Sequence, residues 1–250
     1  MRLPFASSVS ITSEAFALVH CNVWMSLALR VTSIIWSCLQ SFLLDQVYGH
    51  AASKIQVYGH FVDFIAYVQT HFGSVSKCFQ TDNGTVFANN AMSSFLTSRD
   101  ILLRLSYPYT SHENGKAERM LCALLIHASM PRAYWVEALA TATYVLNRSP
   151  SSSVGTKIPY QLLHRSLPEY SHLRVFGCLC YPNLSATTPH KLVPRSAPCV
   201  FLGYPSSNNG YRCLDISTRR VIISRHVMFI ESVFSFTTAP YGASSLDFLL

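Results

Sequence analysis

Residues 79–87 read FQTDNGTVF, a short apolar run that stops at Asp82-Asn83-Gly84. Asn and Gly tolerate positive φ angles, so this triplet is typical of a turn that follows a strand. The same triplet can also place the carboxylate of Asp82 at a strand end, where it is available for chemistry. Partner carboxylates elsewhere in the chain decide between these two interpretations.

The sequence on either side of this stretch predicts alternating strands and helices. Residues 57–72 carry apolar side chains at helical spacing, and Gly73 is a typical residue to end such a helix. A Pro residue is favoured in the first turn of a helix, so Pro131 is expected to open one. The expected elements are strands over 16–24, 75–81 and 101–106 and helices over 57–72, 88–99 and 131–148.

The C-terminal part of the chain has a different pattern. A Ser-, Pro- and Gly-rich stretch at 149–159 is expected to separate it from the rest. Beyond this stretch, short apolar runs divided by turn residues predict a small β-barrel or sandwich. Its expected core includes Val175, Phe176, Val200, Phe201, Val221 and Ile223.

Composition favours a folded protein with a polyanionic partner. Half of the 250 residues are hydrophobic, so a sizeable core can be buried and wholesale disorder is excluded. Lys and Arg outnumber Asp and Glu by 19 to 12, which gives a net charge of +7. That sign favours nucleic acid as a partner. A mildly basic protein without such a partner is the alternative interpretation.

The cysteines and the longest apolar segment give no sign of a metal clip or a membrane span. None of the eight cysteines forms a C-x-x-C pair, so they are interpreted as reduced thiols of an intracellular protein. The apolar segment 23–44 is long enough to cross a bilayer, but Arg30 and several Ser residues interrupt it. A pair of buried strands is therefore predicted there, and no contact with membranes.

A second carboxylate stands at a suggestive distance from the first. Glu118 lies 36 positions after Asp82, beside a helical stripe of apolar residues. A strand-end Asp and a helix-borne Glu can converge on a pair of Mg²⁺ ions about 4 Å apart, as in phosphodiester transfer. Such sites are built from carboxylates because Mg²⁺ prefers hard oxygen ligands.

At this point the chain resembles the integrase region of copia-type retrotransposon polyproteins, which is similar to retroviral integrases. The resemblance covers about residues 11–236. It rests on these motifs: QTDNG, YPYTSHENGKAER, YWVEALATATYVLNRSP, LRVFGC, KLVPRSAPCVFLGY, GYRCLD and SRHVMF. Each motif alone is weak, but the combination is specific.

The resemblance implies an α/β fold, with a ribonuclease-H-like core of a mixed sheet and flanking helices. A Src-homology-3-like β-barrel is expected to follow. The expected boundaries are 1–150 for the core, 151–168 for a linker, 169–236 for the barrel and 237–250 for a frayed tail. The resemblance places the family's second catalytic Asp at Asp82 and its Glu at Glu118, which makes both of them metal ligands.

The family's first catalytic Asp is missing. It belongs to a His-x-Asp-Val-Trp stretch, which reads His20-Cys21-Asn22-Val23-Trp24 here. Asn22 offers one neutral oxygen and cannot bridge two dications with charge. A thousandfold loss of rate corresponds to about 4 kcal/mol, and loss of a bridging carboxylate is expected to cost at least that. Asp45, the nearest downstream acid, falls at a non-catalytic position in the resemblance.

Other departures also predict a decayed element fragment. Val86 and Glu113 stand where the family has Glu and Gln, residues 25–56 match it poorly, and the helix after Glu118 is short. The zinc-binding His/Cys domain expected upstream of the core is not found before the start at Met1. These features predict an integrase, a polynucleotidyl transferase by family, that is catalytically impaired.

Three further functional interpretations stay open beside the impaired integrase. They are a live transferase with a third ligand from elsewhere, a non-enzymatic nucleic-acid-binding or interaction module, and a membrane protein using 23–44. The family implies DNA as partner, two Mg²⁺ ions as cofactor, self-association, and a nuclear or cytoplasmic location. Lys116 and Arg119 flank Glu118 and are interpreted either as phosphate contacts or as two solvated helix residues. A second group either forms a basic face or consists of ordinary strand-edge charges; it comprises Lys191, Arg195, Arg219, Arg220 and Arg225.

Overall fold

The computed structural model describes residues 18–24, 28–31, 54–73, 75–81, 90–105, 116–151, 156–184, 194–205 and 209–237. Contacts divide the chain into two compact units. The first comprises residues 1–117 and 143–171, and the second comprises residues 118–142 and 172–250. These units are defined by contacts and are not the domains predicted from the sequence, whose boundaries are near 150 and 169. Those boundaries stay predictions.

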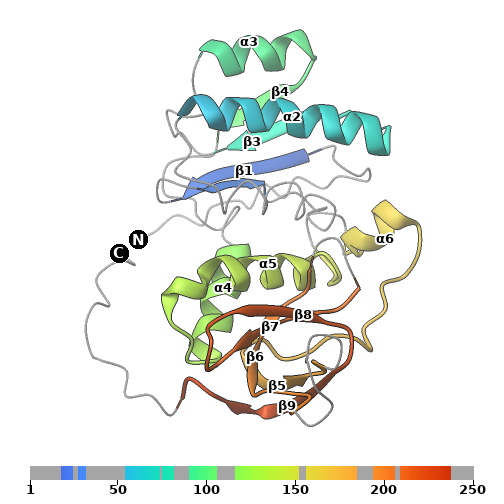
Figure 1. The fold of residues 1–250 in the computed structure, drawn as a ribbon. Coiled ribbons are helices and arrows are strands. Elements are labelled where there is room, and N and C mark those ends of the chain that lie inside the picture. The colour runs from blue at the N-terminus through green and yellow to red at the C-terminus, as the bar shows by residue number, and fades with distance from the viewer. Residues whose placement is uncertain are drawn as a thin grey trace, which may run out of the picture. The chain divides into compact units, whose positions relative to one another are not determined.

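The first unit is built on a mixed four-stranded sheet (Figure 1). Its strands are β1 (Leu18–Trp24), β2 (Ala28–Val31), β3 (Cys78–Thr81) and β4 (Leu102–Leu105). The order is β2-β1-β3-β4, with β2 antiparallel to β1 and the other pairs parallel. Parallel neighbours need crossover connections, and helices α2 and α3 lie in them. The predicted mixed sheet with flanking helices is confirmed.

Aromatic side chains join these helices to the sheet. Helix α2 spans Lys54–Phe72 and α3 spans Asn90–Ser98. Phe61 of α2 is fully buried, and its ring centroid lies 4.3 Å from that of Phe79 on β3 and 6.0 Å from that of Phe95 on α3. Gly73 ends α2 as predicted, with a φ of +59° and its N–H donating to the Gln69 carbonyl.

Helix α6 (Pro159–His164) lies inside the predicted linker, where the sequence analysis expected no helix. Its start is tied to the preceding segment, because the Tyr160 N–H donates to the Asn147 carbonyl at 2.8 Å. Arg148 is buried, and its guanidinium lies 3.4 Å from the ring centroid of Tyr144 and 4.8 Å from that of Tyr160. These cation–π contacts pack the start of α6 against the end of α5 (Trp135–Leu146).

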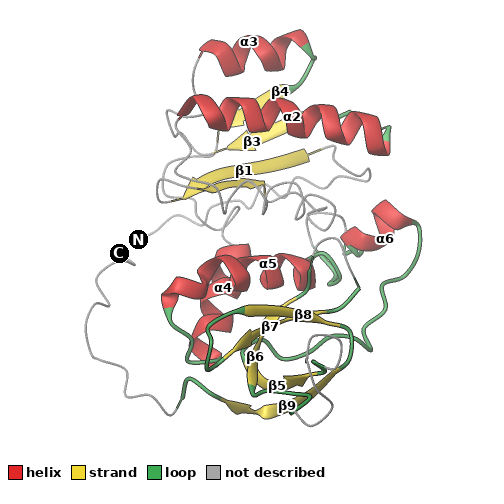
Figure 2. Ribbon diagram, in the orientation of Figure 1, coloured by secondary structure: helices red, strands yellow, loops and turns green. Residues whose placement is uncertain are grey.

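The second unit contains a five-stranded antiparallel sheet in the order β8-β7-β6-β5-β9 (Figure 2). Its strands are β5 (Cys178–Pro182), β6 (Cys199–Gly203), β7 (Tyr211–Asp215), β8 (Val221–Ser224) and β9 (Val227–Phe234). The strands fall where the short apolar runs predicted them. The predicted closure into a barrel is wrong for the described residues, because no pairing joins β8 to β9. Both strands are therefore sheet edges.

Helical segments on one side of this sheet explain why it can stay open (Figure 2). They are α4 (Lys116–His127), the 3-10 turn Arg132–Tyr134 and α5 (Trp135–Leu146). Pro131 thus precedes a 3-10 turn instead of opening the α-helix. The Thr141 hydroxyl donates to the Leu202 carbonyl at 3.3 Å, and Glu137 pairs with Arg212 at 3.7 Å. The helices cover one face of the sheet. In a closed barrel, the other strands of the barrel would cover that face.

The predicted core of the second sheet is only partly right. Phe176, Val200 and Phe201 are buried. Val221 and Ile223 are 45% and 55% exposed, because they lie on the edge strand β8. A strand at an edge has a neighbour on one side only, so fewer residues cover its side chains.

Asp215 stabilises the turn between β7 and β8. Its carboxylate accepts hydrogen bonds from the Ser217 hydroxyl at 2.6 Å, the Ser217 N–H at 2.8 Å and the Thr218 N–H at 3.1 Å. The Ser217 hydroxyl, followed by the Thr218 N–H, lowers the pKa of Asp215 from 3.8 to about 2. The ionised form is thus favoured in the folded state. Its stabilisation is present above pH 3.8 and is lost as the pH falls through about 2.

We therefore expect Asp215→Asn to lower the free energy of unfolding at pH 7 by about 1–2 kcal/mol. The difference from the unmodified chain should shrink between pH 4 and pH 2, as the native carboxylate takes up its proton. Urea unfolding at pH 7, 4 and 2 measures this. Asp100→Asn removes the same charge from an exposed turn and should change stability by less than about 0.5 kcal/mol. A difference that is constant with pH would contradict the role of the charge.

None of the helices in the described part of the chain is long and apolar enough to span a bilayer. Within the apolar segment 23–44, the end of β1 and the whole of β2 are strands, and the remaining residues lie outside the described part. The described portion therefore agrees with the prediction of strands in this segment.

Candidate functional site

Asn22 lies on β1, one of the two interior strands of the first sheet. Strand β1 pairs with β2 on one side, where Asn22 is opposite Arg30, and with β3 on the other. The last paired residues of β1 and β3 are Cys21 and Thr81, and the next residues in the sequence are Asn22 and Asp82. Asp82 lies outside the described residues, as do Asp45 and the side chain of Asn22.

Glu118 lies in the first turn of α4, which begins at Lys116. The side chains of both residues are outside the described part of the structure, whereas Arg119 is exposed. The predicted convergence of Asp82 and Glu118 on one metal site therefore stays a prediction. Among side chains that are described, no group of three His, Cys, Asp or Glu residues is arranged to hold a metal ion.

Helix α4 carries Glu118, and the prediction that it is shorter than the family's helix stays a prediction. It ends at His127, and Ser129 has a φ of +50°. The Met130 N–H reaches back to the Leu125 carbonyl at 3.0 Å, which closes the helix end. Pro131 comes directly after Met130. The helix that carries Glu118 has 12 residues.

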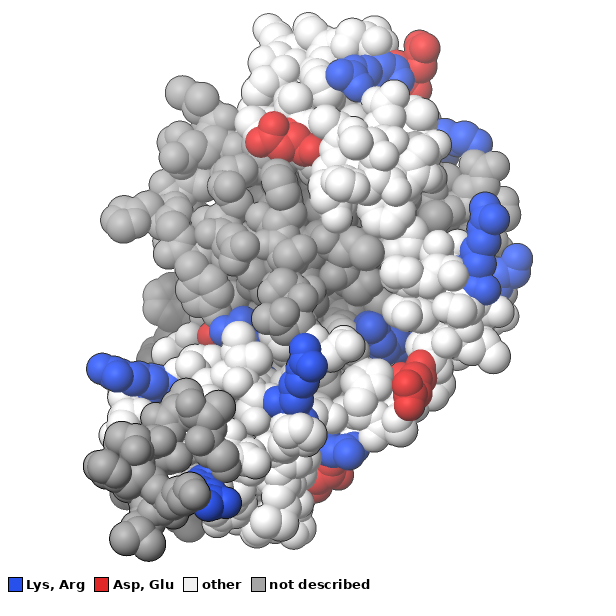
Figure 3. Space-filling model, turned by 45° about the vertical axis from the view of Figure 1, so that its right-hand side comes forward, with Lys and Arg blue, Asp and Glu red and all other residues white. Residues whose placement is uncertain are grey.

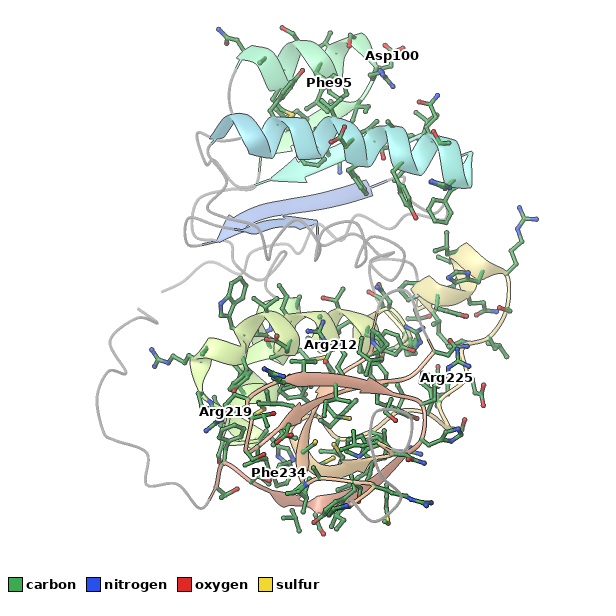
Figure 4. All side chains as sticks on the ribbon, viewed as in Figure 1. Phe95, Asp100, Arg212, Arg219, Arg225 and Phe234 are labelled. Atoms are coloured by element: carbon green, nitrogen blue, oxygen red, sulfur yellow. The ribbon has the colours of Figure 1, made fainter. Side chains whose placement is uncertain are left out.

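The predicted second basic face is divided by strand β8. Arg219 and Arg220 precede this strand and Arg225 follows it, so Arg219 and Arg225 lie at its opposite ends (Figure 4). Arg219 stacks over the ring of Phe236 at 5.8 Å. Lys191 is outside the described residues. Figure 3 shows Lys and Arg side chains at separate places on the face that it draws, with no continuous basic patch.

Arg195 and Arg225 instead meet at a cavity of about 560 Å³ in the second unit. The cavity was not predicted from the sequence, although Arg195 and Arg225 were both predicted as part of a basic face. The lining residues are Arg174, Tyr181, Asn183, Arg195, Ser196, Tyr211, Arg225, His226, Val227, Met228 and Phe229. The sequence feature that could have indicated a binding site is an aromatic residue a few positions after each arginine, Phe201 after Arg195 and Phe229 after Arg225.

The buried thiols of the second sheet form no such site. Cys178, Cys180, Cys199 and Cys213 are fully buried and free. Burial raises the pKa of Cys178 and of Cys199 to about 12. The hydrogen bond with the Cys213 thiol, followed by burial, raises the pKa of Cys180. Protonated thiols are poor nucleophiles, so Cys178, Cys180 and Cys199 act as small apolar core groups.

Comparisons with known proteins identify the relatives of this chain. It is 33% identical over 253 aligned residues to the retrovirus-related Pol polyprotein from transposon RE2 of Arabidopsis thaliana, an alignment that covers 98% of this chain. It is 35% identical over 187 residues, 72% of the chain, to the corresponding polyprotein from transposon TNT 1-94 of Nicotiana tabacum. The resemblance to copia-type Pol polyproteins is confirmed.

This Pol-related chain spans only part of those polyproteins, 17% of the first and 14% of the second. Its residues 178–241 match the family described as the retroviral polymerase SH3-like domain. That match contains all five strands of the second sheet, from β5 to β9. The relationship therefore covers both the motifs of the first unit and the sheet of the second.

Similar solved structures include the magnesium complex of the HTLV-2 integrase catalytic core domain in its dimeric form. It is 16% identical, with a TM-score of 0.36, and the match covers 61% of this Pol-related chain and 98% of that chain. The simian T-cell lymphotropic virus intasome, in complex with a PP2A regulatory subunit, matches at 14% identity and a TM-score of 0.37, over 86% of this chain and 80% of that chain. Scores of this size do not establish a shared arrangement, so the fold rests on the strand order described above.

Proposed function

We propose that this chain derives from the integrase region of a copia-type Pol polyprotein and has lost metal-dependent strand transfer. The relationship to the Pol polyproteins and the motifs around Asp82 and Glu118 support the first part. The second part is supported by Asn22, which lies on β1, an interior strand of the first sheet. The family resemblance places this residue at the position of the first catalytic Asp.

The donor set of Asn22, Asp82 and Glu118 does not fit a pair of Mg²⁺ ions. A two-metal site holds its ions about 4 Å apart and needs charged oxygens to offset their mutual repulsion. The amide of Asn22 supplies one neutral oxygen, so two negative charges face four positive ones. No reaction step through a metal ion is therefore assigned to this chain.

We expect the unmodified chain to show no Mg²⁺- or Mn²⁺-dependent nicking or joining of DNA above background. Asn22→Asp should bind Mn²⁺ more tightly, because it restores the third carboxylate, and this gain should precede any activity. Parallel calorimetric titrations with Mn²⁺ and nicking assays on supercoiled plasmid test both statements. Asn90→Asp is the matched control, because it adds the same charge at the exposed first residue of α3.

Two outcomes would count against this proposal. Metal-dependent nicking by the unmodified chain that Asp82→Asn abolishes would mean that another acid bridges the metals, and Asp45 would be the first to replace. Equal Mn²⁺ affinities of Asn22→Asp, Asn90→Asp and the unmodified chain would mean that Asn22 does not lie at the metal position.

The partners and location follow from the same proposal. The net charge of +7 supports DNA as the partner. Lys116 and Arg119, at the start of α4, are the proposed phosphate contacts beside Glu118. Self-association and a nuclear or cytoplasmic location are proposed from the family resemblance.

A non-enzymatic nucleic-acid-binding module is the second candidate function. It is favoured by one observation, the arginine-lined cavity of the second unit. This function needs neither a metal ion nor a third carboxylate, so it is compatible with Asn22.

A further inference from the structure

The cavity of the second unit is separate from the proposed metal site. All of its lining residues lie between Arg174 and Phe229, and none of them belongs to the motifs around Asn22, Asp82 or Glu118. The cavity has a volume of about 560 Å³ and is widely open to solvent. The cavity is therefore large enough for a group the size of a nucleotide.

The charged residues of the cavity favour an anion. Three arginines and one histidine line it, and no Asp or Glu is among the lining residues that the structure describes. Arg195 and Arg225 are exposed, and neither has an acidic partner within the described ranges. Guanidinium groups bind phosphate oxygens through paired N–H donors. These two residues can thus contact a phosphate without first breaking an ion pair of their own.

The aromatic residues of the cavity favour a ligand with a flat apolar part. Tyr181, Tyr211 and Phe229 line it, and the ring centroids of the last two lie 4.9 Å apart. Arg174 lies over the ring of Phe229 at 5.3 Å and pairs with Glu231 at 3.8 Å. These contacts use the rings of Tyr211 and Phe229, whereas Tyr181 lines the cavity from β5. An aromatic ring offers stacking surface, and every nucleic-acid base has a complementary face.

Backbone hydrogen bonds hold the polar segments of the cavity together. The Asn183 N–H donates to the His226 carbonyl at 2.9 Å, and the Leu184 N–H donates to the Arg195 carbonyl at 2.7 Å. The segments that carry Arg195 and Arg225 are thereby both fixed to the end of β5. A preorganised site loses less entropy when it binds a ligand.

We infer that this cavity binds an unpaired nucleotide of a single-stranded nucleic acid. The base stacks on the ring of Tyr181, and a phosphate contacts Arg195 and Arg225. In a duplex the bases are paired and stacked on one another, so the aromatic surface of the cavity is out of their reach. The inference rests on the proposed function in one respect, which is that the anion bound by the cavity belongs to a nucleic acid.

Fluorescence anisotropy with the full chain tests this inference. The probes are a labelled 12-residue oligothymidylate, a duplex of equal length and an abasic 12-residue oligomer with the same phosphates. We expect the oligothymidylate to bind at least tenfold more tightly than the other two at the same salt concentration. Arg195→Gln and Arg225→Gln should each weaken its binding about fivefold to tenfold and reduce the salt dependence. Tyr181→Leu should remove the preference over the abasic oligomer.

Arg219→Gln and Arg220→Gln are the matched controls, because they remove the same charge at the other end of β8. They should leave the affinity within twofold of the unmodified chain, and circular dichroism checks that each variant is folded. Equal binding of duplex and single strand, or equal loss in all four arginine variants, would overturn the cavity as the site while keeping DNA as a partner. Tighter binding of a phosphotyrosine peptide than of the oligothymidylate would also overturn it. Binding of none of the nucleic acids would refute both this inference and the proposed partner.

Discussion

Gly203→Ala is expected to lower the free energy of unfolding of the second unit by about 3 kcal/mol or more. Gly203 ends β6 with a φ of +116°, a backbone conformation that residues with a side chain rarely adopt. An added Cβ would also overlap the Thr141 hydroxyl of α5, and that hydroxyl is held by its bond to the Leu202 carbonyl. Backbone strain and steric overlap therefore act at the same position.

Urea unfolding followed by circular dichroism measures the loss, and hydrogen exchange locates it. Peptides from β6 and β7 should exchange faster in Gly203→Ala, while those from α2 should not. The double variant Thr141→Ala/Gly203→Ala should recover part of the loss, because the overlap is removed and only the backbone strain stays. Unchanged stability of the single variant would mean that the helix does not approach the strand this closely.

Gly59→Ala is a matched control for this substitution. Gly59 lies in the interior of α2 and has no atom within 4 Å of its added Cβ. Alanine is the better helix former, so this variant should be more stable than the unmodified chain by about 0.5–1 kcal/mol. The same chemical change is thus expected to have opposite signs in the two units.

Phe61→Ala is expected to destabilise the first unit by about 3–5 kcal/mol. Phe61 is fully buried and contacts the rings of Phe64, Phe79 and Phe95, so its removal leaves a cavity where α2, α3 and β3 meet. Exchange should increase in peptides from α2 and β3, while peptides from β6 and β7 stay protected.

Phe72→Ala provides the comparison on the same helix. Phe72 is the last residue of α2 and is half-buried. Both substitutions replace Phe with the better helix former Ala, so the difference between them reports burial and not helix propensity. We expect Phe72→Ala to cost about 1 kcal/mol. Equal losses in the two variants would show that Phe61 is not the centre of this core.

The local elements of this chain follow from its sequence because their signals are local. The stripe of apolar residues in α2 and its stop at Gly73 can be read from neighbouring residues, and so can the short apolar runs that become β5 to β9. The prediction that Asn22 stands at the position of the family's first Asp likewise comes from the sequence alone, since a short motif around it carries the resemblance. Each of these features depends only on residues that are close to one another in the sequence.

Tertiary structure decided the features that depend on which distant segments are neighbours. The sheet stays open, and Val221 and Ile223 are exposed, because β8 has only β7 as a pairing partner and helices take the place of closure. Arg195 and Arg225 share a cavity because antiparallel pairing and two backbone hydrogen bonds bring their segments to the end of β5. Arg219 carries the same charge close by in sequence, yet it lies at the far end of β8. Charge is a property of single residues, whereas a binding site requires long-range pairing to bring them together.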